Sequence, residues 1–296
     1  MACTNSSSTS RNPSGGDEKI DVSQFGCLMP KETDLANETF WDQPCGESHF
    51  KSLGFDSLSQ FDDWFFDYKY PYLSNIISFD SFAGKKILEV GLGYGSVSQK
   101  IMESGASFYG LDLAKGPVEL VRGRLKEKGF LGEVVQGSVL DCPWDDSSFD
   151  GVVSIGCLHH TGDLTKGIKE VHRVLKPGGN CVIMVYNAFS YRQLFLSPVS
   201  TFRQYFRQRK EGTIPRRGEE GERVLYDSNL EKESAPATDF VGSFGLKVIL
   251  RPLFSEIEIV KANIGDELFL RFFPRSWKLK ILGPLLGLDL YAKLTK

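Results

Sequence analysis

The middle of the chain repeats one pattern of hydrophobic and polar positions. Short apolar runs rich in β-branched and aromatic residues predict strands, and apolar positions that recur every three to four residues predict helices between them. The predicted strands lie at 87–89, 107–112, 132–136, 149–156 and 181–186, and two later ones at 256–260 and 288–294. The predicted helices lie at 96–104, 118–128, 164–175, 191–209 and 243–254. This alternation predicts a doubly wound α/β fold with a parallel sheet.

The regions outside this repeat differ in composition. A tail rich in Ser, Thr, Asn and Gly offers little to bury, so we predict that it is disordered. A dense aromatic segment follows, which predicts helices packed on the main domain and, compatibly, a lid over a ligand site. The predicted divisions are a tail at 1–30, a helical lid at 31–83, a core at 84–187, an inserted cap at 188–245 and the completion of the sheet at 246–296.

Polar or glycine-containing segments follow four of the predicted strands. They are residues 89–95, Asp112, Ser138 and residues 156–160. In doubly wound sheets, ligands bind at the carboxyl ends of the strands, where such loops meet. The four segments should therefore converge on one rim, which predicts a small-molecule site.

The first of these segments carries glycines at every second position, namely Gly91, Gly93 and Gly95, and is preceded by Glu89. Glycine adopts backbone angles closed to other residues and lets a ligand lie against the main chain. An adenosine-containing cofactor fits a glycine turn followed by an acid. The dinucleotide-binding fingerprint, however, has glycine at the position of Ser96 and no acidic residue before the turn, so this sequence matches it poorly.

The motif Glu89-Val-Gly-Leu-Gly-Tyr-Gly95 resembles motif I of the class I S-adenosylmethionine-dependent methyltransferases. Further resemblances are Gly110-Leu-Asp-Leu113, Gly137-Ser138, Asp145–Asp150, Leu158-His-His160 and Glu170–Gly179. The resemblance is strong over 84–187, and weaker segments near both ends are similar to a bacterial subgroup of small-molecule enzymes. It implies a Rossmann-like, seven-stranded methyltransferase sheet and S-adenosyl-L-methionine as the cofactor.

The resemblance also implies roles for individual residues. Asp112 should accept hydrogen bonds from the ribose hydroxyls, and Leu113 should lie against the adenine. Ser138 stands where relatives usually carry an aspartate that contacts the adenine amino group, and Val139 should contribute its backbone amide. Lys69 and Tyr70 stand where relatives often carry Arg-Tyr near the cofactor's carboxylate. The full predicted cofactor set is Lys69, Tyr70, Glu89, Gly91, Gly93, Gly95, Asp112, Leu113, Ser138, Val139 and Gly156.

Methyl transfer to a hydroxyl group needs a base for the acceptor's proton, and histidine suits this role near neutral pH. His159 and His160 directly follow the fourth predicted strand, on the ligand rim. They are the candidate catalytic residues, and the alternative is that the pair only shapes the site. We therefore expect a methyltransferase of secondary metabolism that methylates a small molecule, at oxygen in preference to nitrogen or carbon. A catalytically inactive, cofactor-binding scaffold is the alternative from another class, and a dinucleotide oxidoreductase is a third.

Composition limits the partners. With a formal net charge of −3, the chain as a whole has no attraction to nucleic acid or to an acidic membrane. No apolar run approaches the length of a membrane helix, so we expect no membrane insertion. The six cysteines are scattered, which favours a reduced, cytoplasmic protein without a metal site. The basic residues between Arg203 and Lys210 suit a solvated helix or an acidic acceptor, and the pattern leaves the oligomeric state open.

Overall fold

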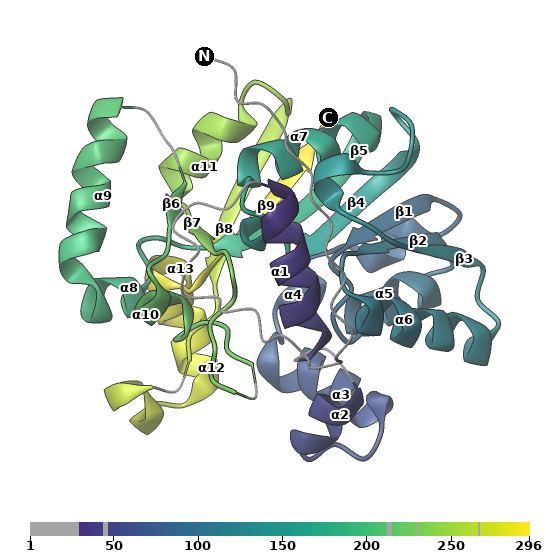
Figure 1. The fold of residues 1–296 in the computed structure, drawn as a ribbon, viewed down its shortest axis with the longest axis horizontal. Coiled ribbons are helices and arrows are strands. Elements are labelled where there is room, and N and C mark those ends of the chain that lie inside the picture. Colours follow the sequence, from purple (N-terminus) through teal and green to yellow (C-terminus); the bar gives the residue numbers. More distant parts are fainter. Residues whose placement is uncertain (1–29, 44–46, 212–214, 230, 266) are drawn as a thin grey trace, which may run out of the picture.

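A seven-stranded sheet forms the centre of the molecule in the computed structural model (Figure 1). The model describes residues 30–296 except 44–46, 212–214, 230 and 266. The strand order is β3 (Gly132–Gln136), β2 (Ser107–Asp112), β1 (Lys86–Val90), β4 (Phe149–Ile155), β5 (Leu175–Tyr186), β9 (Asp289–Thr295) and β8 (Glu256–Ala262). The five strands from β3 to β5 are parallel, whereas β9 and β8 are antiparallel to their neighbours. The predicted α/β class and the predicted strands are confirmed.

The sheet is buried on both faces. Along β1, Ile87 belongs to one hydrophobic cluster and Leu88 to the other, because successive side chains of a strand point to opposite faces. Helices α5 (Ser96–Glu103) and α6 (Lys115–Lys128) cover the Ile87 face. Helices α7 (Leu164–Val174) and α11 (Ser243–Leu250) cover the Leu88 face. The parallel strands therefore lie inside the molecule, and only their ends are available to a ligand.

Two predicted boundaries were wrong in ways that local chemistry explains. The predicted helix 191–209 is broken into α8 (Tyr191–Leu196) and α9 (Pro198–Glu211), because a residue before proline disfavours the helical region. Its connecting residue, Ser197, has φ −136° and ψ 51°. The fifth strand begins at Leu175 instead of Cys181, since α7 ends at Val174 and the chain extends through the Pro177-Gly-Gly179 segment.

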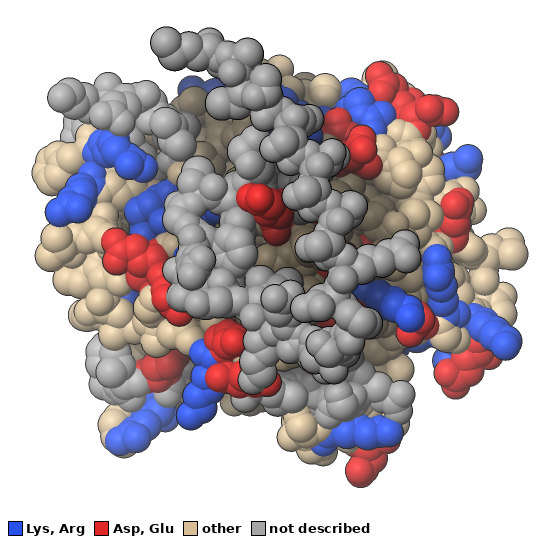
Figure 2. All heavy atoms as spheres, viewed as in Figure 1, with Lys and Arg blue, Asp and Glu red and all other residues tan. Residues whose placement is uncertain are grey.

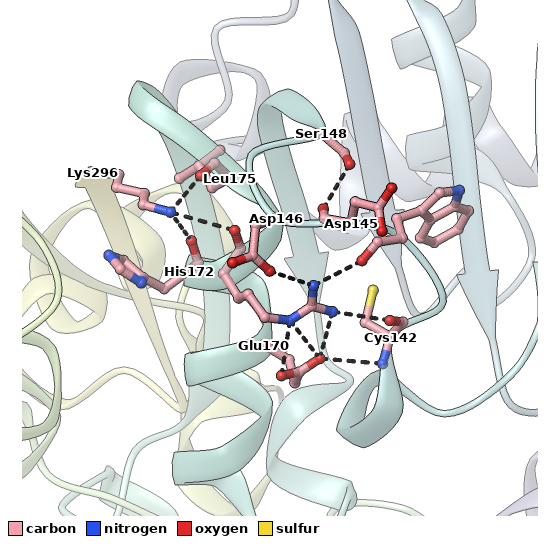
Figure 3. Close-up of polar contacts among 10 residues, drawn as sticks. Cys142, Asp145, Asp146, Ser148, Glu170, His172, Leu175 and Lys296 are labelled. Atoms are coloured by element: carbon pink, nitrogen blue, oxygen red, sulfur yellow. Dashed lines mark hydrogen bonds and ion pairs between the residues drawn. The ribbon is translucent and has the colours of Figure 1, made fainter.

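The carboxyl end of α7 is held by residues of the Glu170–Gly179 motif (Figure 3). Arg173 donates to the carbonyls of Trp144 and Cys142 at 2.8 and 3.0 Å and pairs with Glu170 at 2.8 Å. The ammonium group of Lys296 donates to the carbonyls of His172 and Leu175, each at 2.6 Å. The bond to His172 satisfies a carbonyl group that the end of α7 leaves without a partner, and the Arg173 bonds hold the loop before β4. This motif therefore fixes the loop before β4 and the last strand.

Short helices of the N-terminal region pack on the sheet and across its rim. They are α1 (Pro30–Asp42), α2 (Glu47–Ser52), α3 (Leu58–Trp64), the π-helix η2 (Phe65–Lys69), α4 (Leu73–Ile76) and the 3₁₀ helix η3 (Phe79–Phe82). Their aromatic rings form a connected set, and the rings of Phe61 and Tyr94 lie 4.6 Å apart between centroids. This contact joins the aromatic segment to the glycine loop. The predicted disordered tail, up to residue 29, lies outside the described residues.

The segment after β5 forms a cap of short elements. It holds α8, α9, α10 (Glu220–Arg223) and a small ribbon of β6 (Arg216–Arg217) with β7 (Asp239–Phe240). Between β8 and β9 lie the 3₁₀ helix η6 (Leu268–Phe272), α12 (Arg275–Trp277), the π-helix η7 (Lys278–Leu282) and α13 (Gly283–Leu286). Two further 3₁₀ turns, η4 (Val139–Asp141) and η5 (Leu158–His160), follow β3 and β4. Within the described part of the chain, no helix has the length and apolar character needed to cross a bilayer.

Candidate active site

A cavity of about 510 Å³ lies at the carboxyl ends of the parallel strands. Its walls come from the loops after β1, β2, β3, β4 and β5, from the N-terminal helices and from the cap. In Figure 1, α1 passes in front of this edge of the sheet. The predicted rim is therefore a cavity, and both the aromatic segment and the cap contribute to its lining.

The three glycines after β1 have different surroundings. A Cβ on Gly91 would meet Cys157 Cβ at 2.3 Å, and one on Gly95 would meet Val121 Cγ2 at 2.8 Å. Around Gly93, which has φ +50°, no atom lies within 4 Å of such a Cβ. Gly91 and Gly93 line the cavity, whereas Gly95 begins α5 and packs on α6. Of the three, Gly93 leaves open space for a ligand against the backbone.

Asp112 ends β2 and lines the cavity. The backbone N–H groups of Leu92 and Ala114 donate to its two carboxyl oxygens at 2.6 and 2.9 Å. Burial raises the pKa of Asp112 to about 6, and these backbone donors oppose the rise. Its carboxylate is thereby fixed in position, and each oxygen retains acceptor capacity toward the cavity.

Glu89 lies on the cavity wall below the glycine loop. Ser98 of α5 donates to its carboxyl group, and burial raises the pKa of Glu89 to about 8. At neutral pH this side chain is mainly protonated, so it presents a neutral polar group to the cavity. Gly156 (φ +80°) and Leu113 also line the cavity, from the ends of β4 and β2.

Ser138 and Val139 line the wall between β3 and α1. The hydroxyl of Ser138 accepts a hydrogen bond from the N–H of Leu140 and thereby caps η4. Asp34 of α1 hydrogen-bonds Ser138, and burial raises the pKa of its carboxyl group above the usual value. Asp34 was not predicted from the sequence, because no pattern within α1 shows which residue faces β3. It brings a carboxyl group to the wall where the sequence has serine.

Lys69 and Tyr70 both line the cavity. The Lys69 ammonium lies 5.5 Å from the Trp64 ring and 5.3 Å from the Tyr70 ring. The Arg275 guanidinium donates to the Lys69 backbone carbonyl at 2.8 Å, which anchors η2 to the C-terminal region. The structure thus brings this predicted pair to the cavity wall, next to the aromatic lid.

The two candidate histidines occupy different environments. His160 lines the cavity, whereas His159 is fully buried, does not line it and lies behind it against Tyr186. Burial and the neighbouring His160 hold the pKa of His159 well below its usual value. His160 Nδ1 lies 2.8 Å from the carbonyl oxygen of Ala237, which requires the proton on Nδ1. Nε2 is then the ring nitrogen without a proton, and it lies toward Asp227.

Two residues that the sequence did not single out complete this wall. Asp227 Oδ2 lies 3.5 Å from His160 Nε2, and the Tyr186 hydroxyl donates to Asp227 Oδ1 at 3.0 Å. Asp227 comes from the cap, which carries no motif that would have marked it. All three residues line the cavity. They form a polar cluster in which a carboxylate faces an imidazole.

Asp112 and this polar cluster lie apart along the sheet edge, whereas the glycine loop lies next to the turn after β4. Strands β1 and β4 stand between β2, which carries Asp112, and β5, which carries Tyr186. At the usual spacing of neighbouring strands, the two residues stand about 14 Å apart. The cavity therefore has room for one ligand at the glycine loop and a second at the His160–Asp227 cluster. Among the described residues, no cluster of His, Cys, Asp or Glu could hold a metal ion.

Known proteins resemble the central part of this chain. The uncharacterised methyltransferase YdaC of Bacillus subtilis is 37% identical over 102 residues, which make up 34% of this chain and 55% of that protein. Demethylmenaquinone methyltransferase of Tropheryma whipplei is 30% identical over 126 residues, or 42% of this chain and 49% of that protein. The chain thus spans about half the length of these curated relatives.

A solved structure and a family model agree with this likeness. A putative S-adenosylmethionine-dependent methyltransferase from Listeria monocytogenes shares the fold with a TM-score of 0.56, at 16% identity over 77% of this chain and 96% of that one. Residues 88–183 match the family model described as a methyltransferase domain. The matched segment holds the glycine loop, Asp112 and both histidines, so residues 88–183 carry a domain similar to those of S-adenosylmethionine-dependent methyltransferases.

Proposed function

We propose that this protein transfers the methyl group of S-adenosyl-L-methionine to a hydroxyl group of a small molecule. The observation that carries the proposal is one cavity with two chemically distinct ends, the glycine loop with Asp112 at one and the His160–Asp227 cluster at the other. The sulfonium cofactor supplies an activated methyl group when bound. The residues of the chain then have to bind and orient the cofactor and the acceptor, exclude water from the cavity and accept the proton of the acceptor hydroxyl.

The residues at the glycine loop fit this cofactor. Gly93 leaves open space beside the backbone, and Asp112 presents a fixed carboxylate that suits the two hydroxyls of a ribose. Ser138, Val139 and Asp34 line the neighbouring wall, where we place the adenine. Lys69 and Tyr70 remain our assignment for the carboxylate end of the cofactor, because both line the cavity beside the aromatic lid. Gly95 is assigned a packing role instead of a direct contact.

The His160–Asp227 cluster supports methylation at oxygen. With the Nδ1 proton held by the Ala237 carbonyl, Nε2 is the ring nitrogen that would take the proton of an acceptor hydroxyl. The Asp227 carboxylate 3.5 Å away then stabilises the imidazolium that forms. The acceptor oxygen keeps the electron pair that forms the new bond to carbon. His159 is assigned no part in this step, since it lies behind the cavity.

The residues of the same wall also indicate the chemical class of the methyl acceptor. Trp41, Tyr186 and Tyr226 give this part of the cavity flat aromatic surfaces, which suit a ring-containing acceptor. One relative is named for demethylmenaquinone, a small molecule, and this supports a small-molecule acceptor here. We extend this to a phenol-like or other hydroxylated product of secondary metabolism, modified in the cytoplasm.

The test combines binding and turnover. Titration with S-adenosylhomocysteine should show binding that Asp112→Ala weakens by about 10- to 100-fold, the range expected for hydrogen bonds to a charged group. Incubation with methyl-labelled cofactor and a panel of phenols, amines and activated carbon acids should label the phenols. Binding without transfer to any acceptor would favour an inactive scaffold. If the label appears only on amines or on carbon acids, the acceptor atom is nitrogen or carbon, and the proposal of methylation at oxygen is wrong.

A further inference from the structure

The exposed face of α9 is apolar and its buried face is polar, the reverse of an ordinary surface helix. Val199, Phe202 and Phe206 share one face, at spacings of three and four residues, and are 71, 59 and 65% exposed. Thr201 and Gln204 lie on the opposite face and are buried. Thr201 donates to the Gln193 carbonyl of α8 at 3.1 Å, and Gln204 accepts a hydrogen bond from Arg216 of β6 at 3.2 Å. The helix is thus held to the cap by polar contacts and presents its apolar side outward.

The helical residues 275–286 repeat this inversion. Trp277, Ile281 and Leu285 follow one another at intervals of four and are 43, 46 and 61% exposed. Lys278, between them, is buried, with its ammonium 3.4 Å from the carbonyl oxygen of Gly265. The preceding Phe272 is 74% exposed. A second helical segment therefore also exposes a row of apolar side chains and buries a cation, while its Leu282 and Leu286 pack inward.

The two segments meet at one end of the molecule. Arg192, directly before α9 in the cap, pairs with Glu267, which precedes η6. Tyr191 and Leu270 share one small hydrophobic cluster, against which Leu282 packs. Figure 1 shows α9 and α12 on the side of the molecule away from α5 and α6. We call the exposed residues of both segments the apolar–basic surface: Val199, Phe202, Arg203, Phe206, Arg207, Arg271, Phe272, Trp277, Lys280, Ile281 and Leu285.

The charge of these segments is one-sided. Residues 189–210 contain five basic residues and residues 268–288 contain four, and neither segment contains an acidic residue. Lys278 is buried and Arg192 pairs with Glu267, whereas Arg203, Arg207, Arg271 and Lys280 are exposed. The whole chain has a net charge of −3, which does not reveal this local positive charge. Figure 2 shows basic side chains among uncharged surface at the upper left, where α9 lies in Figure 1. Exposed apolar patches rimmed by charge mark interaction sites.

We propose that the apolar–basic surface docks this protein onto an anionic lipid bilayer. A bilayer interface takes up aromatic and aliphatic side chains at the acyl boundary, and anionic headgroups match arginine and lysine beside them. A second copy of the chain fits less well, since facing surfaces without acids would repel each other. Single-stranded nucleic acid could stack on the aromatic residues of this surface, but it would leave the aliphatic Val199, Ile281 and Leu285 without an apolar partner, which a bilayer provides.

Docking would bring the acceptor end of the cavity close to the bilayer. The Ser190 hydroxyl lies 2.9 Å from the hydroxyl of Tyr226, and the Arg192 guanidinium lies 4.6 Å from the Tyr226 ring. Tyr226 in turn lines the cavity. The segment that leads into α9 therefore holds a wall of the proposed acceptor site. This consequence rests on the proposed function, whereas the docking itself does not.

The experiment is co-sedimentation of the full chain with vesicles, without cofactor or acceptor. We expect binding to phosphatidylcholine vesicles that contain about 30% phosphatidylglycerol, and much weaker binding to phosphatidylcholine alone or at high salt. Arg203→Glu with Arg207→Glu should weaken binding by about 30-fold or more. Phe202→Ser with Phe206→Ser should also weaken it. The matched controls, Lys126→Glu with Lys128→Glu on α6 and the exposed Leu131→Ser, should bind like the original chain.

Each variant is first checked for an unchanged circular dichroism spectrum and unchanged S-adenosylhomocysteine binding. The proposal would be overturned if the surface variants and the controls lost vesicle binding to the same extent, or if the original chain did not bind anionic vesicles. So would a dimer that Phe202→Ser with Phe206→Ser dissolves, or tighter binding to a single-stranded oligonucleotide than to the vesicles. Vesicle binding by a chain that transfers no methyl group would leave the docking intact and would count against the proposed function alone.

Discussion

The Nε2 atom of His160 lies 3.5 Å from Oδ2 of Asp227, and these two residues come from parts of the chain far apart in sequence. His160 ends the turn after β4, and Asp227 belongs to the cap that follows β5. The Ala237 carbonyl, also from the cap, fixes the tautomer of the imidazole from its other nitrogen. A base oriented in this way exists only when the cap is folded over the core.

The first prediction separates the two adjacent histidines. His160→Gln should lower kcat by about 10²- to 10⁴-fold, the usual contribution of a general base, with cofactor binding unchanged. His159→Gln should lower the thermal midpoint and change kcat much less, since His159 does not line the cavity. Single-turnover rates and cofactor titration of both variants make the comparison. Equal turnover of the original chain and His160→Gln would remove His160 as the base.

A second prediction concerns the pH dependence of stability. Burial raises the pKa of Glu89 from 4.5 to about 8. Between these values the folded protein holds a proton that the unfolded chain has released, so this group makes stability fall as pH rises from about 4.5 to about 8. Glu89→Gln should therefore reduce the loss of thermal midpoint between pH 5 and pH 8. The exposed Glu103→Gln is the control, and an unchanged loss in Glu89→Gln would contradict the prediction.

The glycine loop gives a third prediction. Gly91→Ala and Gly95→Ala should destabilise the fold, because the new Cβ atoms would meet Cys157 at 2.3 Å and Val121 at 2.8 Å. Gly93→Ala meets no protein atom and should cost about 1–2 kcal/mol, from its positive φ alone. It should instead weaken cofactor binding, because its methyl group enters the cavity. Denaturant unfolding and cofactor titration of the three variants test this order, and intact cofactor binding by Gly93→Ala would contradict it.

A fourth prediction concerns the buried ion pair that joins the lid to the glycine loop. Arg124 of α6 pairs with Asp62 of α3 at 2.7 Å and donates to the Tyr94 carbonyl at 2.9 Å, while Ser96 donates to Asp62 at 2.6 Å. Removing one partner leaves a buried charge, so Arg124→Met should destabilise the fold by about 3–5 kcal/mol. The double variant with Asp62→Leu should recover part of the loss. Additive losses in the double-mutant cycle would show that the pair is not coupled.

A fifth prediction tests Asp34, which hydrogen-bonds Ser138 on the wall assigned to the adenine. Asp34→Ala should weaken cofactor binding, and Asp34→Asn should weaken it less, because the amide oxygen still accepts a hydrogen bond. The analogue in which the adenine amino group is replaced by oxygen should bind Asp34→Asn better than the original chain. An unchanged preference between the two cofactors in both variants would exclude Asp34 from this contact. The exposed Glu32→Ala on the same helix is the control.

The sequence by itself determined the central sheet and one end of the cavity. The strands of the parallel core are short apolar runs that can be recognised from their own residues. The glycine turn and the two acids that flank it, Glu89 and Asp112, all lie within one strand–helix–strand unit. Such features depend on residues close in the chain, so Glu89, Gly93 and Asp112 could be placed on the cavity wall before the fold was known.

The tertiary structure decided the rest, because it depends on residues far apart in the chain. Asp34 reaches Ser138 only because α1 packs across the rim, and Asp227 reaches His160 only because the cap folds back. The two adjacent histidines look alike in sequence, yet packing puts one on the cavity wall and one behind it. The apolar face of α9 is exposed because polar contacts with α8 and β7 hold Thr201 and Gln204 inward.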